Sequence, residues 1–159
     1  MKNLNLKIFA LILLGVILSS CSIAQIIRQN KENKFVIDVV SAPASGIVDS
    51  SLTINWQVVG EQKTISQTAV YYDYVSHTGN FGQNVSPLLS GYLKFTDADN
   101  QGEIKVPGSF SAKVLPSQPG ILYYRAMAKI DDKYYWTPEY TIAISAQDSS
   151  LPSQPIGTK

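Results

Sequence analysis

The stretch that decides the fold is Leu52-Thr53-Ile54-Asn55-Trp56-Gln57-Val58-Val59. Its bulky apolar residues fall on every second position, which are Leu52, Ile54, Trp56 and Val58. Because successive side chains of a β-strand point to opposite faces, this period of two places them on one buried face. The stretch therefore predicts a half-buried strand with the indole of Trp56 inside a two-layered β fold.

Further segments on either side of this stretch are rich in β-branched and aromatic residues, with Gly, Pro, Asn and Asp between them. They are Lys34–Val40, Ser66–Val75, Gly108–Leu115, Gly120–Ile130 and Lys133–Ser145, with a possible seventh strand near Ser90–Phe95. A helix of any length is hard to place among them. The expected fold class is all-β, a single antiparallel two-sheet sandwich over residues 34–146.

Three of these segments carry a family resemblance. Ser51-Leu-Thr-Ile-Asn-Trp56 resembles the second strand of a fibronectin type III domain, whose Trp fills the centre of the core. Leu115-Pro116, Pro119-Gly120 and Tyr123–Ala128 are similar to the turn and sixth strand of that family. The resemblance implies a fibronectin type III-like or immunoglobulin-like sandwich, with Lys133–Ile144 as the seventh strand after the Asp131-Asp132 turn.

The chain departs from the family pattern in two places. The position of the family's corner tyrosine falls on Leu122, with Tyr123 one step away. Either the hydrogen bond of that tyrosine is absent or the register shifts by one residue. The connection from Ser76 to Gly102 is also longer than the family's usual one.

The N-terminus reads as an export signal. An apolar run from Ile8 to Leu18 follows two lysines, and Leu18-Ser19-Ser20-Cys21 resembles the lipobox of bacterial lipoproteins. This resemblance implies that residues 1–20 are a signal peptide, expected as a helix, and that Cys21 becomes the lipidated membrane anchor.

Two alternatives to lipidation remain open. Cleavage after Ser22-Ile23-Ala24 would release a secreted chain that begins at Gln25. The apolar character from Ile8 to Ile27 is also long enough for an uncleaved membrane anchor. All three readings place the sandwich outside the cytosol, in the cell envelope or beyond it.

Composition limits the classes of partner and site. Cys21 is the single cysteine, so the chain holds no internal disulfide and no metal site built on thiolates. Loss of residues 1–20 removes Lys2 and Lys7 and changes the formal charge from +1 to −1. Binding of nucleic acid calls for a clustered basic face, and is not expected here.

Composition also marks the ends of the domain. Residues 21–33 are polar and charged after the anchor, and are expected to form a tether. Residues 147–159 are rich in Ser and Pro, and are expected to form a disordered tail.

Tyrosines supply the first candidate contact surface. Tyr71, Tyr123 and Tyr135 lie on segments that would be neighbours in one sheet, and alternation points about half of such side chains outward. Outward tyrosines suit contact with a protein or a glycan, but they are equally ordinary as cross-strand pairs. One solvent-facing patch of these three would favour binding, whereas buried or scattered tyrosines would favour a structural spacer.

The long connection is the second candidate surface, because loops on a rigid scaffold carry most recognition. It contains His77, Phe81, Tyr92 and Phe95. The alternative is that Phe81 and Tyr92 plug the end of the sandwich. His77 has no Asp, Glu or Cys at metal-ligand spacing, so a ligand or catalytic role for it is not expected.

Two aspartates form part of a calcium motif. Asp97-Ala-Asp99-Asn-Gln-Gly102 opens like a calcium loop, but the closing Glu is missing, since Gly108 stands at the twelfth position. Asp97 and Asp99 are therefore weak metal candidates, and a polar turn is the simpler interpretation.

No catalytic motif and no cofactor motif is present, so an enzyme is not expected. The sequence favours a non-enzymatic envelope lipoprotein that presents one β-sandwich for binding of a protein or a glycan. The alternative is a structural spacer or an assembly subunit of an envelope complex, with no small-molecule ligand.

Overall fold

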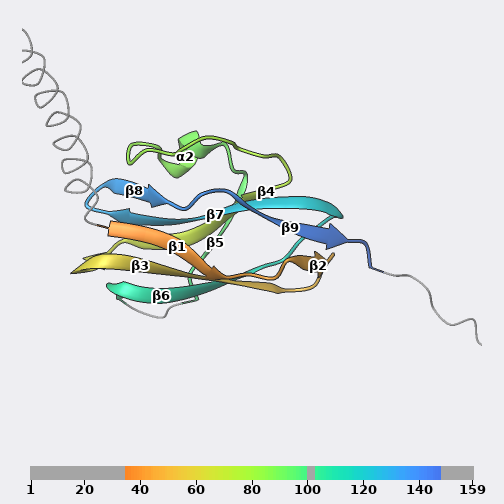
Figure 1. Ribbon diagram of the computed structural model, residues 1–159, viewed down its shortest axis with the longest axis horizontal. Helices are drawn as coiled ribbons and strands as arrows, with labels where there is room; N and C mark the ends of the chain where they lie inside the picture. Colours follow the sequence, from red (N-terminus) through yellow and green to blue (C-terminus); the bar gives the residue numbers. More distant parts are fainter. Residues whose placement is uncertain (1–34, 100–102, 148–159) are drawn as a thin grey trace, which may run out of the picture. The chain divides into compact units, whose positions relative to one another are not determined.

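The computed structural model describes residues 35–99 and 103–147, and these residues form a sandwich of two β-sheets (Figure 1). The smaller sheet has the order β1-β3-β6, from the strands β1 (Phe35–Ser41), β3 (Leu52–Ile65) and β6 (Ile104–Val114). Both pairings in this sheet are antiparallel.

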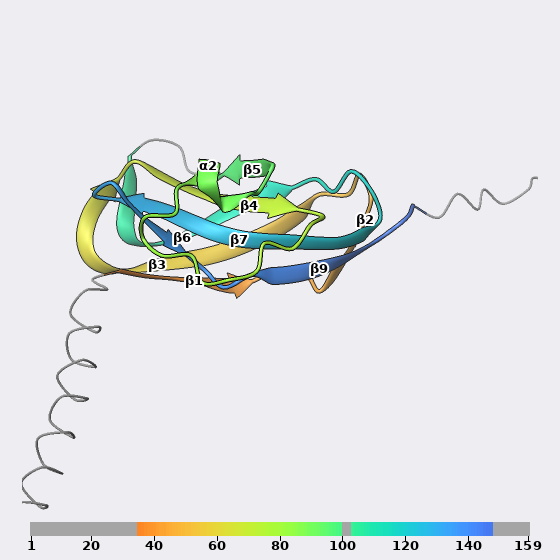
Figure 2. The same cartoon turned by 90° about the horizontal axis from the view of Figure 1, so that it is seen from above.

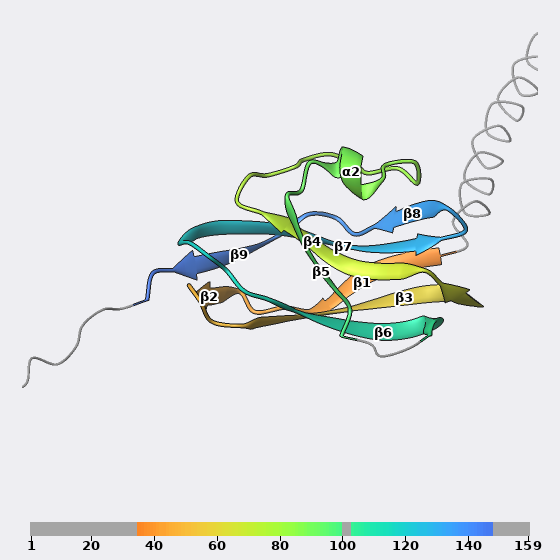
Figure 3. The same ribbon diagram turned by 180° about the vertical axis from the view of Figure 1, so that it is seen from behind.

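The larger sheet has the order β2-β9-β7-β4-β5, with β8 also paired to β7. Its strands are β2 (Ser45–Ile47), β4 (Gln67–Asp73), β5 (Lys94–Asp97), β7 (Gly120–Ile130), β8 (Lys133–Trp136) and β9 (Tyr140–Ser145). All of its pairings are antiparallel except the short parallel one between β2 and β9. Figure 3 shows the two layers from behind, with β5 at the edge of the larger sheet.

This partition of strands is that of an immunoglobulin-like sandwich. The strands β1, β3 and β6 occupy the places of A, B and E, whereas β4, β7 and β9 occupy those of C, F and G. The predicted fold class, an all-β two-sheet sandwich, is confirmed. The expected signal helix, the tether and all but the first residue of the expected tail lie outside the described residues.

Trp56 lies at the centre of the core, as its alternating pattern predicts. Its side chain is completely buried, and its ring centroid lies 6.0 Å from that of Phe110 on β6. The indole Nε1–H donates to Thr68 Oγ1 at 2.8 Å, and the Thr68 hydroxyl donates to the carbonyl of Met127 at 2.8 Å. This chain of hydrogen bonds satisfies the buried indole and joins the two sheets through their middle strands.

The strand expected over Lys133–Ser145 is two strands, separated by residues 137–139. Both pair with the same edge of β7. Across the break between them, Thr137 supplies hydrogen bonds to the backbone groups of that edge. The Thr137 N–H donates to the carbonyl of Ala126 at 3.0 Å, and the Ala126 N–H donates to Thr137 Oγ1 at 3.0 Å. Pro138 has no N–H to offer a ladder, so a continuous strand is interrupted there.

Other boundaries also differ from expectation. The possible seventh strand lies at Lys94–Asp97 as β5, while Pro87–Ser90 forms the single helical turn α2. The strand expected at Gly108 begins at Ile104, and β3 continues six residues past Val59 to Ile65.

A tyrosine other than the expected one ties down the turn before β7. The Tyr74 hydroxyl oxygen accepts from the N–H of Ser117 at 3.0 Å and from that of Gln118 at 3.2 Å. Leu122, at the family's tyrosine position, is completely buried in the core instead. The hydrogen-bonded tie to this turn therefore comes from Tyr74, the residue after β4, and neither Leu122 nor Tyr123 makes it.

Candidate functional site

The long connection between β4 and β5 lies over the outer face of the larger sheet, and we call residues 74–93 the covering loop. Figure 2 shows it in green, crossing above β4 and β7 with α2 near its end. Pro87 begins α2, and Gly91 ends it in the left-handed region at φ 85°. Proline is favoured in a first helical turn and glycine just after a last one, which explains this local structure.

A small second core fixes the covering loop to the sheet. Tyr92 of the loop is buried with Ala69, Tyr71 and Met127, which point away from the main core. Phe81 packs against this cluster, with its ring centroid 5.3 Å from that of Trp136 and 6.4 Å from that of Tyr92. Phe81 and Tyr92, candidate contact residues with an alternative role as a plug at the end of the sandwich, pack instead onto the outer face of the larger sheet.

The side chain of Arg125 on β7 binds backbone carbonyls of the covering loop. Its side chain is only 3% exposed, and its guanidinium donates to the carbonyls of His77 at 3.2 Å, Gly79 at 2.8 Å and Thr137 at 2.9 Å. The guanidinium carbon lies 4.3 Å from the ring centroid of Phe81, within cation–π range. One buried cation thus clamps the covering loop to the break between β8 and β9.

Glu139 also binds the covering loop, through hydrogen bonds that its carboxylate accepts. Its carboxylate accepts from the Ser76 hydroxyl at 2.5 Å, from the His77 N–H at 2.7 Å and from the Tyr92 hydroxyl at 2.7 Å. Burial alone would raise the pKa of Glu139, but these hydrogen bonds and the charge of Arg125 hold that pKa below its usual value. Burial, together with the hydrogen bond to Glu139, raises the pKa of Tyr92 well above its usual value.

His77 is held inside the loop. Its Nε2 lies 3.5 Å from Asp73 Oδ2, a carboxylate partner that spacing analysis did not identify, and its ring packs edge-on against Tyr92 at 4.7 Å. A Cβ on Gly91 would lie 2.7 Å from His77 Nδ1, so only glycine fits there. Among the described residues, no group of three or more His, Cys, Asp or Glu side chains is placed to hold a metal ion.

A pocket of about 420 Å³ lies beside the clamp. Its lining residues are Thr78, Gly79, Asn80, Arg125, Pro138 and Glu139. The side chains of Thr78 and Asn80 are exposed and form no hydrogen bond within the described part of the chain. The Thr78 hydroxyl and the Asn80 amide are therefore exposed polar groups at the pocket beside Arg125.

The covering loop also carries three leucines in solvent, and we call Leu88, Leu89 and Leu93 the leucine knob. Their exposed fractions are 92%, 73% and 83%. Single exposed leucines are ordinary, but three within six residues on one fixed loop form a local apolar protrusion.

The three predicted contact tyrosines do not form one patch. Tyr71 is only 5% exposed, because Phe95 stacks on it at 5.3 Å and Trp136 packs edge-on at 5.2 Å. Tyr135 packs into the opposite face of the sheet, against Phe35 at 5.6 Å, and Tyr123 is half-buried on β7. The three tyrosines are therefore scattered, which is the alternative that the sequence left open: the covering loop, β5 and β8 cover Tyr71, whereas Tyr135 faces the main core.

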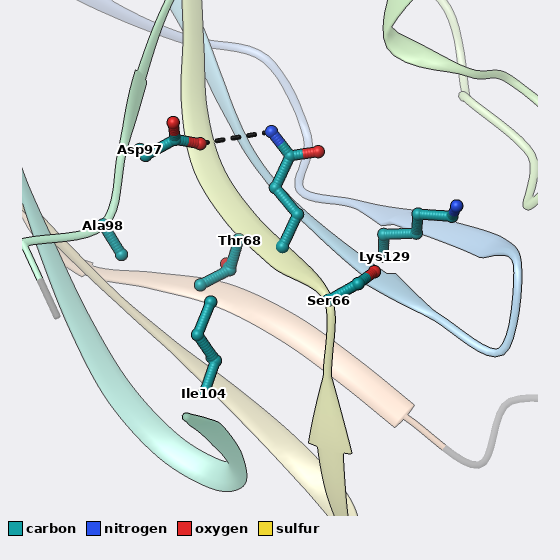
Figure 4. Close-up of a pocket in the computed structure, with 7 residues that line it drawn as sticks. Ser66, Thr68, Asp97, Ala98, Ile104 and Lys129 are labelled. Atoms are coloured by element: carbon teal, nitrogen blue, oxygen red, sulfur yellow. Dashed lines mark hydrogen bonds between the residues drawn. The ribbon is translucent and has the colours of Figure 1, made fainter. Parts of the chain in front are cut away.

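The two candidate metal residues lie at the edge between the sheets. Asp97 lines a pocket of about 490 Å³, where its carboxylate accepts from the Gln67 side chain at 3.1 Å (Figure 4). The Asp99 N–H donates to the carbonyl of Ser111 at 2.8 Å. Residues 100–102, which complete the motif, lie outside the described residues, so the calcium site stays a prediction.

Cys21 and the whole export signal lie outside the described residues as well. Within residues 35–99 and 103–147, no helix has the length and apolar character needed to cross a membrane.

Arg125 and Glu139 organise the loop, and sequence reasoning identified neither of them. A usable signal was present for the arginine. It stands alone inside the run Leu122–Ala128, where every other residue is apolar or aromatic, and a charge in a buried strand requires partners.

No family model matches the chain, and no curated protein matches it. Among solved structures, the chain is similar to the CARDB domain of a Pyrococcus furiosus protein in complex with di-metal ions, at 8% identity over 71% of this chain and 94% of that one, with a TM-score of 0.36. It is also similar to a conjugative transposon lipoprotein from Bacteroides eggerthii, at 9% identity over 70% of this chain and 98% of that one, with a TM-score of 0.36. At these identities and TM-scores, neither likeness bears on function.

Proposed function

We propose that this chain is a non-enzymatic, lipid-anchored protein of the cell envelope that presents one β-sandwich for contact with a protein partner. Cys21 supplies the anchor in this proposal, and the covering loop supplies the contact. The support for the anchor is the resemblance of Leu18-Ser19-Ser20-Cys21 to a lipobox behind an apolar run.

The observation that carries the contact is the fixation of an exposed loop by a buried cation. Arg125 donates to three backbone carbonyls, two of them from the covering loop, and these bonds fix the loop backbone at His77 and Gly79. A loop ordered in advance loses little conformational entropy when a partner binds. Thr78 and Asn80 on this loop offer free polar groups to that partner.

A protein suits this surface better than a glycan does. Glycans stack on exposed aromatic faces, and Tyr71 and Tyr92 are buried beneath the loop or within it. The pocket beside Arg125 is lined by no aromatic side chain.

The second candidate is a structural spacer or assembly subunit. The placement of Tyr71 and Tyr135 on opposite faces of the sheet favours it, since no single tyrosine patch is available for binding.

The anchor is tested by mass spectrometry of the N-terminus of protein purified from the cells that make it. An acylated Cys21 supports the proposal, whereas a chain that begins at Gln25 or retains Met1 contradicts it. Cys21→Ala is the matched control, because it removes the acceptor sulfur and leaves the apolar run intact.

The contact is tested by photo-crosslinking in those cells. A crosslinking residue at Asn80 should give a discrete adduct with one protein, and the same residue at exposed Gln57 on the smaller sheet should not. No adduct at Asn80, or equal adducts at both positions, would leave the spacer as the better account.

A further inference from the structure

We propose that the leucine knob inserts into the hydrocarbon edge of the bilayer at which the protein is anchored, and so lays the sandwich on the membrane. The inference rests on the proposed function, because it takes the membrane anchor as given. It adds a second point of attachment, and its chemistry is that of a lipid surface.

The knob has the composition that hydrocarbon accepts. Its three side chains are aliphatic, and each is at least 73% exposed. No charged side chain occurs in residues 78–93, and the chain's 25 charged residues all lie outside this stretch. Lys94 follows Leu93 directly, and its ammonium group donates to Ser117 Oγ at 3.0 Å. The three leucines can therefore enter an apolar phase without burying an ion, provided that Lys94 keeps its bond to Ser117 at the surface.

Three hydrogen bonds within residues 86–92 satisfy part of the backbone around the knob, which lowers the cost of placing it in an apolar phase. The Leu89 N–H donates to the carbonyl of Ser86 at 2.9 Å, and the Ser90 hydroxyl donates to the carbonyl of Pro87 at 2.7 Å. The Tyr92 N–H donates in turn to Ser90 Oγ at 3.3 Å. This helical turn can meet lipid without first unfolding.

The knob is also supported from below. Tyr92, one residue before Leu93, is buried in the second core and bonded to Glu139. Trp136 Nε1–H donates to the carbonyl of Val85 at 2.8 Å, two residues before Pro87. The leucines are thus presented by a fixed base, and insertion does not have to order the loop.

A protein partner suits the knob less well. Leucine is under-represented among the residues that dominate protein–protein affinity, where Trp, Tyr and Arg lead. Three side chains are also few beside the roughly 20–30 residues that each side of a standard interface contributes. Shallow insertion into lipid needs no complementary surface and suits a small convex knob.

The length of chain before the sandwich permits this contact. Fourteen positions separate Cys21 from Phe35, and a chain of that length reaches at most about 50 Å. Tethering at that range gives an effective concentration near the millimolar scale, so weak insertion is enough.

The test tethers the protein by a route that does not use the acyl chain. Every described strand belongs to the unit that begins at Phe35, so a chain starting at residue 21 retains the whole sandwich. This chain carries Cys21→Ser and an N-terminal hexahistidine tag, and is held on phosphatidylcholine vesicles by a nickel-chelating lipid. Leu88→Cys provides one thiol for an environment-sensitive fluorophore, and Val36→Cys, exposed on the smaller sheet, is the matched control.

The fluorophore at position 88 should shift to the blue and be quenched by spin-labelled lipid about threefold more than the one at position 36. Adding Leu89→Ser and Leu93→Ser should lower the insertion constant at least about tenfold, with unchanged thermal unfolding. Replacing a third of the lipid by phosphatidylglycerol, or raising the salt, should change little, because the three inserting side chains carry no charge.

Equal quenching at positions 88 and 36 would overturn the inference. So would a dimer in sedimentation that the leucine variant converts to monomer, because the knob would then dock on a second copy of the chain. The mass of the mature N-terminus decides the proposed anchor separately, so failure of one does not imply failure of the other.

Discussion

Arg125 is the residue on which the order of the covering loop depends. A lysine at this position keeps the charge but cannot reach three separate carbonyls with one ammonium group. We expect Arg125→Lys to lower the free energy of unfolding by about 3 kcal/mol, because buried carbonyls lose charged donors. Urea unfolding measures this loss, and hydrogen exchange should show faster exchange in residues 76–81.

Lys129→Met is the matched control for that prediction. Lys129 lies on the same face of β7, but its side chain is 30% exposed and its ion pair with Asp132 lies at the surface. It should change stability by less than about 1 kcal/mol. Equal effects of the two variants would mean that Arg125 is not a clamp.

Tyr74 and Tyr123 allow a matched test of the tyrosine tie. Tyr74→Phe removes the oxygen that accepts from Ser117 and Gln118, and should cost about 1–2 kcal/mol in urea unfolding. Tyr123→Phe should cost less than about 0.5 kcal/mol, since the Tyr123 hydroxyl has no hydrogen bond within the described residues. A larger loss of stability in Tyr123→Phe than in Tyr74→Phe would mean that Tyr123, and not Tyr74, ties down the turn.

At the scale of elements, the hairpin between β7 and β8 has a turn that its sequence does not favour. Asp131 and Asp132 both have positive φ, of 51° and 59°, between the paired residues Ile130 and Lys133. Two such residues make a type I′ turn, which prefers Asn-Gly. Replacing the pair by Asn-Gly should raise the free energy of unfolding by about 1 kcal/mol, measured in urea.

That gain is reduced by the ion pairs of Asp131 with Lys63 and of Asp132 with Lys129, which the change removes. Exposed pairs contribute little, so the backbone effect should dominate. Lys63→Met alone measures the first pair. A net loss of stability in the Asn-Gly variant, larger than that of Lys63→Met, would show that the ion pairs outweigh the turn.

Elements with a local signal could be predicted from sequence, and elements fixed by distant contacts could not. Alternation at Leu52–Val59 belongs to one strand, so it was sufficient to predict β3 and the burial of Trp56. The break at Thr137 depends on Ala126, eleven residues earlier, and the covering loop depends on a bond from Tyr92 to Glu139, 47 residues later. The sequence left the tyrosine surface undecided for the same reason, because Tyr71 is periodic in sequence but is covered by another segment.

For the whole molecule, the dependence of stability on pH follows from the groups whose pKa the fold changes. Hydrogen bonds lower the pKa of Glu139 below its ordinary value. Its contribution is therefore complete above the unfolded pKa, near 4.5, and is lost as the pH falls through the lower folded value. The pKa of Glu103 is lowered too, by its hydrogen bond with Thr64 and its ion pair with Lys105, but Glu103 is exposed and solvent screens its effect on stability.

The loss of stability that we expect at high pH comes from tyrosines. Burial raises the pKa of Tyr124 to about 12, and that of Tyr92 also rises. Their contributions are complete below the unfolded pKa of 10.0 and are lost as the pH rises through the folded values, since the unfolded chain ionises first. Stability should therefore be flat between about pH 5 and 10 and fall on both sides.

Thermal unfolding from pH 2.5 to 11.5 measures the loss of stability at acid pH and at alkaline pH. Two variants identify the residues responsible for each loss. Glu139→Gln should lower stability near neutrality, because a neutral amide accepts the covering loop's hydrogen bonds more weakly, and should reduce the loss of stability at acid pH. Tyr124→Phe should leave stability near neutrality almost unchanged and should reduce the loss of stability at high pH, because the hydroxyl that ionises is removed. A loss of stability at acid pH as steep in Glu139→Gln as in the natural chain would mean that Glu103 and other carboxylates carry it, and that the covering loop is not held by an ionised Glu139.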